Sequence, residues 1–190
     1  MNFKEKLTFE LIKAIRSILL NLMKNKEHYY YITLVSDGLA NTPCISAWSL
    51  EALERAKEDG EEEIDMIKWS YAESPYCAWL QENFVEVEAL LNTRFKFRGS
   101  EREYYLRYSA MEEAMRVLDH EGIFALNQNR EDVIVLVEVM SPDWTNTERA
   151  YRMNNPHTKI FAEWLEEAAE YADEEEYENK KYEDDMEEAE

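Results

Sequence analysis

The side chains that could carry chemistry in this chain are mostly carboxylates, and Asp37 is the best placed of them. It follows a buried apolar run and precedes Gly38, so it stands at the end of a predicted strand. Ligands of open sheets often bind at strand ends, which makes residues 37–43 a candidate ligand-binding or catalytic loop, with Trp69 and Glu73 as neighbours. A turn made by Asp37 with Gly38 explains the same residues without any function and is the simpler interpretation.

Nucleophilic and metal chemistry have little support from residue spacing. The cysteines and histidines are scattered along the chain, at Cys44, Cys77, His28, His120 and His157. Paired zinc ligands are therefore missing, and so are the GxSxG and HExxH motifs. The four glycines do not cluster, so no phosphate-binding loop is expected. We expect no metal and no cofactor, and we expect both cysteines to be reduced and buried.

Aromatic residues beside acidic ones at predicted loops favour a protein interface instead. Trp48, Tyr71, Tyr76 and Trp144 are expected to be exposed and to anchor a partner. The full set of candidate binding residues, for an interface or a ligand, is Tyr29, Asp37, Trp48, Trp69, Tyr71, Glu73, Tyr76 and Trp144.

The overall charge favours a basic partner. The 190 residues include 42 acidic and 21 basic ones, which gives a net charge of -21. The resulting field repels nucleic acid and anionic membranes, so neither is expected as a partner. No window approaches the ~18 consecutive apolar residues of a membrane span, and no leader-like segment is recognisable, so we expect a cytoplasmic protein. The oligomeric state stays open.

One segment runs against this charge. Residues 93–108 hold five basic and two acidic residues, interleaved with five aromatic ones. Cations alternating with aromatic rings can bind single-stranded nucleic acid. Because the surrounding acids oppose such binding, we expect these cations to pair with the protein's own carboxylates, with the acidic C-terminal tail as one candidate.

Hydrophobic periodicity predicts the elements that position these residues. Residues 3–26 carry an apolar stripe of helical spacing, and residues 29–35 form a strand with apolar side chains on both faces. Further strands are expected at 44–48, 64–71 and 133–140, the last of them central, and further helices at 49–59, 74–91, 101–121 and 155–165. This order predicts an α/β or α+β fold with a small mixed sheet of about four strands covered by helices.

The chain divides by composition near residue 165. Residues 1–165 are expected to form a single globular α/β domain. Residues 166–190 hold 14 acidic residues and two lysines, which predicts an acidic tail that passes from helix into disorder.

Four stretches carry a resemblance to a known family. They read YYYITLVSDG, ISAWSLEALERA, KWSYAESPY and DVIVLVEV, the last ahead of an Asn-Pro pair and a terminal helix. With them the chain resembles a family of uncharacterised bacterial proteins catalogued as a domain of unknown function. The resemblance covers roughly residues 5–165 and implies a compact intracellular α/β domain. Some members look like immunity proteins of toxin systems, and the family offers no catalytic residues to carry over.

Two functions remain open at this point. The first is a non-catalytic binding protein that recognises a basic protein partner, with an immunity-like role as one option. The alternative is a small enzyme or ligand-binding domain with its site at residues 37–43. A pocket with converging polar groups beside that loop would favour the alternative.

Overall fold

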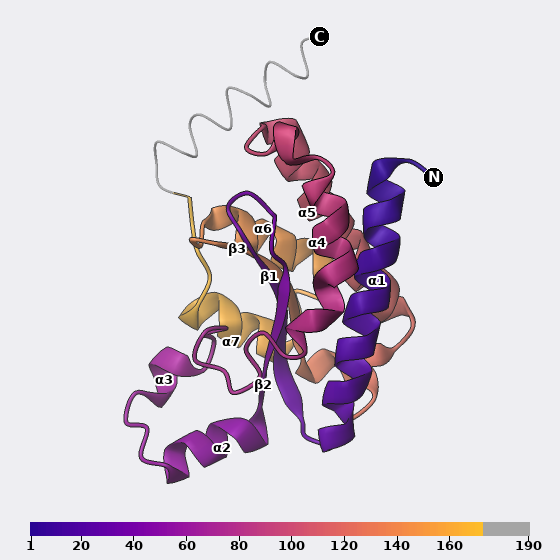
Figure 1. Cartoon of the computed structure of the whole chain (residues 1–190). Coiled ribbons are helices and arrows are strands. Elements are labelled where there is room, and N and C mark those ends of the chain that lie inside the picture. The colour runs from indigo at the N-terminus through magenta and orange to yellow at the C-terminus, as the bar shows by residue number, and fades with distance from the viewer. Residues whose placement is uncertain (173–190) are drawn as a thin grey trace.

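The chain folds around a small mixed sheet (Figure 1). The computed structural model describes residues 1–172. The three strands of its sheet are β1 (Tyr29–Asp37), β2 (Cys44–Ser49) and β3 (Ile134–Met140). Their order is β2-β1-β3, with β2 antiparallel and β3 parallel to the central β1. The prediction of an α/β fold with a mixed sheet under helices is confirmed.

Helices cover both faces of the sheet (Figure 1). The longest, α1 (Phe3–Leu22) and α5 (Glu101–His120), pack against each other, and α4 (Val85–Asn92) packs against α1. On the other side lie α2 (Leu50–Glu58), α3 (Ile64–Ile67) and α7 (Lys159–Glu167). Short 3-10 turns link these elements at η1 (Met23–Asn25), η2 (Gln81–Phe84), η3 (Phe95–Phe97), η4 (Ile123–Ala125) and η5 (Arg130–Asp132).

The apolar character of β1 on both faces follows from its central position. Every side chain from Tyr29 to Ser36 is buried. A shift of register between Tyr29 and Tyr31 lets the rings of Tyr30 and Tyr31 both contact Trp69, at centroid distances of 5.3 and 6.1 Å. Within residues 1–172, no helix combines the length and apolarity needed to cross a membrane.

The strand predicted to be central, β3, lies at the edge of the sheet. The helix α6 (Trp144–Met153) runs beside it, and side chains take the place of a fourth strand. Asn146 pairs with both the N–H and the C=O of Val139, at 2.7 and 3.3 Å. Asn154 pairs with both groups of Val135, at 2.9 and 2.8 Å. The backbone groups of Val135 and Val139 at this edge of the sheet are therefore hydrogen-bonded without another strand. The side chains of β3 are nevertheless as apolar as those of a central strand.

Residues 64–71 do not form the predicted strand. Ile64–Ile67 is one helical turn, and the residues after it cross the face of the sheet instead of extending its edge. The carbonyl of Ser70 accepts from Trp48 Nε1 at 2.8 Å, and that of Tyr71 accepts from Ser46 Oγ at 2.7 Å. The weak alternation of this segment thus reports contacts with a sheet face, and residues 1–172 contain three strands instead of about four.

Of the helix predicted over residues 74–91, only the part from residue 81 onward is helical. Ser74 does not cap a helix there, because its hydroxyl donates to the carbonyl of Ala47. Ala78 and Leu80 adopt positive φ angles of 50°, which no α-helix accommodates. Helical structure begins only with η2 and continues as α4.

Candidate functional site

A pocket of about 450 Å³ opens between α2, α3 and the turn that follows α3. The chain enters α2 directly from β2, because Ser49 ends the strand and caps the helix by accepting from Ala52 N at 2.9 Å. Gly60, at φ 95°, turns the chain at the other end of α2. The residues that line the pocket are Trp48, Ala52, Arg55, Ala56, Asp59, Gly60, Glu61, Ile67, Glu73 and Pro75.

The pocket combines apolar walls with acidic groups. Trp48, Ala52, Ala56, Ile67 and Pro75 supply the apolar part. Trp48 is only 1% exposed, and its bond to the carbonyl of Ser70 fixes the indole in place. A long amphipathic side chain could therefore lay its alkyl stem on rigid apolar surface here.

The acidic groups of the pocket are Asp59, Glu61 and Glu73, and all three are exposed. Arg55 is the one cation among the lining residues, and Glu27 already holds it at 2.8 Å. The pocket therefore presents an excess of negative charge to solvent. It is suited to a cationic group rather than to an anion.

Behind the pocket, a hydrogen-bonded cluster organises Arg55. Glu27 Oε2 accepts from Ser49 Oγ at 2.5 Å and from Tyr76 Oη at 2.7 Å, and Arg55 also reaches Tyr76 Oη at 3.2 Å. Burial favours the neutral form of Glu27, but these hydrogen bonds and the charge of Arg55 outweigh it, so the pKa of Glu27 lies below its usual value. Glu27 thus stays ionised and neutralises Arg55.

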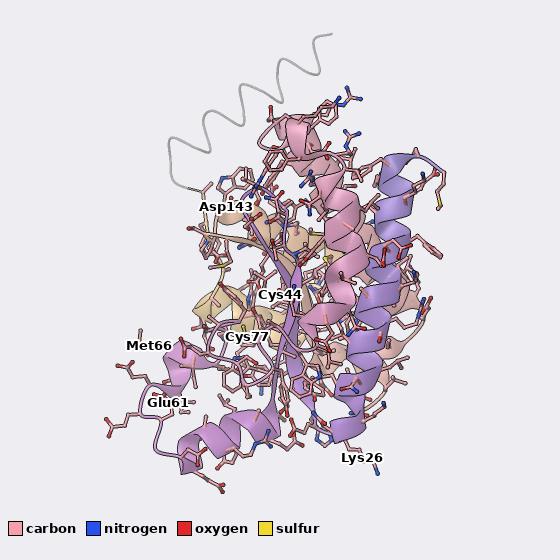
Figure 2. All side chains as sticks on the ribbon, in the orientation of Figure 1. Lys26, Cys44, Glu61, Met66, Cys77 and Asp143 are labelled. Carbon is pink, nitrogen blue, oxygen red and sulfur yellow. The ribbon has the colours of Figure 1, made fainter. Side chains whose placement is uncertain are left out.

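Acidic side chains continue around the pocket. Eight acidic residues between positions 54 and 73 are all exposed: Glu54, Glu58, Asp59, Glu61, Glu62, Glu63, Asp65 and Glu73. Each of the three cations of this stretch forms an ion pair with a carboxylate. Arg55 pairs with Glu27, Lys57 pairs with Glu54, and Lys68 pairs with both Glu163 and Glu167. Figure 2 shows Glu61 and Met66 on the outer side of the turn, and Met66 is 74% exposed. We call these eight residues the acidic surface.

The structure brings Trp48 and Glu73 together among the predicted site residues, since both line the pocket. Tyr76 lies behind it in contact with Arg55, and the ring of Tyr29 packs edge-on against Tyr76 at 5.8 Å. Trp69 contacts the end of α7, where its Nε1 donates to Glu167 at 2.7 Å.

Two expected anchors are not exposed. Trp48 is 1% and Tyr76 7% exposed, because each indole or phenol is bonded inward. Tyr71 is half-buried over β2, and Trp144 is half-buried as the first residue of α6. The aromatic residues near the pocket therefore form its walls and support instead of projecting toward a partner.

Asp37 forms a turn with the residues that follow it, as the simpler of the two interpretations of this loop predicts. Its carboxylate accepts from Leu39 N at 3.1 Å and from Asn41 N at 2.9 Å. Gly38 and Leu39 line a separate pocket of about 220 Å³ against the first turn of α5, and neither Asp37, Trp69 nor Glu73 belongs to it. Trp69 and Glu73, which were expected as neighbours of residues 37–43, thus do not line the pocket beside this loop.

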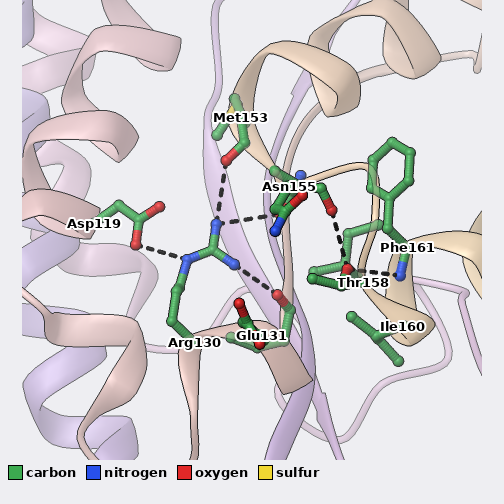
Figure 3. A pocket seen from close by; sticks show the side chains of 11 residues that line it. Asp119, Arg130, Glu131, Met153, Asn155, Thr158, Ile160 and Phe161 are labelled. Carbon is green, nitrogen blue, oxygen red and sulfur yellow. Dashed lines mark hydrogen bonds and ion pairs between the residues drawn. The ribbon is translucent and has the colours of Figure 1, made fainter.

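In a third pocket, of about 340 Å³, the cation Arg130 is already bonded within the protein (Figure 3). Arg130 donates to Asp119 at 2.7 Å, to the carbonyls of Val133 and Met153 at 2.8 and 3.2 Å, and to Asn154 at 3.2 Å. This arginine ties α5, β3 and the end of α6 together. Its role is structural, since four of the five N–H donors of its guanidinium group are bonded within the protein.

A buried carboxylate lies at the far end of β3. Glu138 accepts from Tyr31 Oη at 2.6 Å, and burial raises the pKa of Glu138 above its usual value. Glu170 lies nearby, and burial together with the charge of Glu138 raises its pKa to about 7. Thr147 Oγ1 holds the backbone carbonyl of Glu170 at 2.6 Å, so residues beyond α7 remain packed on the domain.

The cysteines are not activated. Both are free thiols, and burial raises the pKa of Cys44 to about 11 and that of Cys77 above its usual value. Within residues 1–172, no three His, Cys, Asp or Glu side chains are placed to hold a metal ion.

Asp59 and Glu61 were missed as site residues from the sequence. Their signal is the acidic run of residues 61–63 directly after Gly60, between the predicted helix 49–59 and the predicted strand 64–71. The convergence of this loop with Trp48 and Glu73 depends on the path of residues 64–73 across the sheet, which the sequence pattern misrepresents.

Comparison with known proteins gives one family. Its model, described as a domain of unknown function (DUF4303), matches residues 11–155, from within α1 to just beyond α6. No curated protein and no solved structure matches the chain. The match spans the whole sheet, the pocket and most of the 190 residues, so the chain belongs to the DUF4303 family, a domain of unknown function.

Proposed function

We propose that this protein is a non-catalytic binding protein whose acidic pocket receives a lysine or arginine side chain of a basic protein partner. The observation that carries the proposal is the composition of the 450 Å³ pocket between α2 and α3. Apolar residues form its walls, exposed carboxylates border it, and its one lining cation is neutralised from behind.

Lysine and arginine side chains match both parts of such a pocket. Their alkyl stems would pack on Ile67 and Pro75, which are more exposed than Trp48, while the cationic head would lie near the three carboxylates of the pocket. A neutral or acidic ligand would leave the three carboxylates without a compensating charge. The pocket thus discriminates by charge as well as by shape.

The surrounding acidic surface would guide a basic partner toward the pocket. Its eight exposed carboxylates lie on one stretch of chain, and complementary charges raise association rates more than they raise affinity. Fast capture of a basic protein is what a toxin-neutralising immunity protein requires. We therefore propose an immunity-like role in the bacterial cytoplasm as the setting of this binding.

Carboxylates at the end of α2 support a binding role over a stabilising one. Glu58 ends the helix and Asp59 follows as its C-cap, where the negative end of the helix dipole disfavours acids. Neither carboxylate has a cationic partner within residues 1–172. Acids in this position lower stability slightly, which is typical of residues retained for recognition.

The test uses the full chain and a short peptide of alternating arginine and glycine residues, followed by amide and indole NMR shifts. We expect shifts at residues 59–61 and at the indole of Trp48, weaker at high salt. Asp59→Asn, Glu61→Gln and Glu73→Gln together should weaken binding by about tenfold, from three exposed charge pairs. Shifts scattered over the whole surface would contradict the proposal.

A matched control separates this site from the overall charge. Glu82, Glu86 and Glu166 are exposed and lack a cationic partner among the described residues. Changing all three to glutamine removes the same charge, and we expect affinity for the arginine peptide to fall less than twofold. Equal losses in the two triple variants would show that only net charge matters. The same pair of variants can then be compared in capture of partners from the native host.

A further inference from the structure

A second charged surface, of opposite sign, lies at the start of α5. Phe95, Lys96 and Phe97 form η3, and Arg98, Arg102 and Tyr105 follow it. Phe95 is 63% and Tyr105 59% exposed, although aromatic rings of this size are usually buried. We call these six residues the basic-aromatic patch.

The cations of the patch are not used by the fold. Lys96, Arg98 and Arg102 have no carboxylate partner within residues 1–172. Their neighbours Arg94 and Arg107 share Glu103, at 2.6 and 3.1 Å. In a chain with twice as many acidic as basic residues, three unpaired cations side by side call for an acidic partner.

Cations and rings of the patch are already arranged together. Lys96 Nζ lies 5.0 Å from the centroid of Phe97, and the guanidinium of Arg98 lies 5.6 Å from that of Phe95. These contacts hold the cations against exposed rings and lower the entropy lost when a ligand binds. A ligand with both carboxylates and aromatic rings would complement the patch.

We propose that residues 173–190 of this chain bind the basic-aromatic patch. These residues include eleven acidic residues and two lysines, with tyrosines at 177 and 182. They thus supply negative charge for the cations of the patch and rings that can stack on its exposed aromatic side chains. The contact is independent of the acidic pocket and of the function proposed for it.

The path of the chain brings this segment to the correct end of the molecule. The C-terminal ends of β1 and β3 are adjacent, since Asp37 pairs with Met140. Beyond β1, Leu39 lines a pocket together with Gly99 and the first turns of α5. Beyond β3, Thr147 holds Glu170, and the described chain ends at the same end of the molecule as η3 (Figure 1).

Length and concentration favour the chain's own segment over other acidic partners. Eighteen extended residues span at most roughly 60 Å, more than the width of a small domain. A tethered segment has an effective concentration in the millimolar range, which the acidic surface of a second copy does not reach in dilute solution. Nucleic acid is disfavoured by the net charge of -21.

The test is carbodiimide coupling of lysine amines to carboxylates in the full chain, mapped by mass spectrometry. Lys96 should couple to residues 173–190 at least about threefold more than Lys6, which is equally unpaired and exposed. Mixing light and heavy isotope-labelled chains should give products within one chain only. Equal coupling at Lys6, or products that join two chains, would overturn the proposal.

A variant pair makes the test specific for the patch. Arg98→Gln with Arg102→Gln keeps Lys96 as the probe and should reduce its coupling by about threefold to tenfold. Lys24→Gln with Lys159→Gln removes the same charge elsewhere and should leave the coupling of Lys96 unchanged. Equal effects of the two pairs would refute the patch. Binding of a single-stranded oligonucleotide at physiological salt, lost in the first pair, would assign it to nucleic acid instead.

Discussion

The pairing of β3 with side chains of α6 predicts a graded loss of stability. Asn146→Ala removes the partners of both backbone groups of Val139, and both residues are almost completely buried. A buried backbone group left without a partner costs about 1–3 kcal/mol, so we expect a loss of about 2–4 kcal/mol. Arg149 would lose its bond to Asn146 Oδ1, at 2.6 Å, as well.

Asn154→Ala is the matched comparison, because Asn154 makes the same pair of bonds to Val135. Asn154 is only half-buried and lines the 340 Å³ pocket, so water can replace its amide. We expect a loss of about 1–2 kcal/mol for this variant. Urea unfolding with unchanged slope measures both values. If Asn146→Ala falls within ~0.5 kcal/mol of the parent, or if Asn154→Ala costs more, the edge pairing does not stabilise the fold as argued.

Two further predictions concern titrating groups. The pKa of Glu170 is raised to about 7 by burial and the charge of Glu138, so the folded state holds a proton that the unfolded state releases near pH 4.5. The free energy of unfolding should therefore fall by about 1–2 kcal/mol, after solvent screening, as pH rises from about 5 to 8. Glu170→Gln should flatten this pH dependence. A steeper fall in the variant would contradict the assignment to Glu170. The second group is Cys44, whose pKa is raised to about 11 by burial. Its reaction with a thiol reagent at pH 8 should be about a hundredfold slower in the native than in the unfolded chain. Equal rates in the two states would disprove the burial of this thiol.

The strands were predictable where burial alone decides the pattern. Residues of β1 are apolar at both parities because the strand has neighbours on both edges and layers on both faces. The position of β3 was not predictable, because amides on a separate helix satisfy its outer edge. Positive φ angles at Ala78 and Leu80 were equally hidden, since neither residue type favours them.

The candidate site was predictable only in part, for the same reason. Trp48 and Glu73 were recognised from their types and flanking residues, but their meeting at one pocket depends on how residues 64–73 cross the sheet. Asp59 and Glu61 look like ordinary solvated acids in sequence. Only the fold shows that they line the same pocket as Glu73.

The distribution of cations explains why this acidic surface is available for binding. Arg55, Lys57 and Lys68 are the bases nearest to it, and each is held by a carboxylate. The carboxylates that hold Arg55 and Lys68 lie outside the acidic surface. These two cations therefore do not neutralise the acidic residues of the surface itself. Repulsion among these acids lowers the free energy of unfolding, and a bound cation would relieve it. Binding of a basic peptide should therefore raise the melting temperature of the protein by more than it does in the Asp59, Glu61 and Glu73 triple variant.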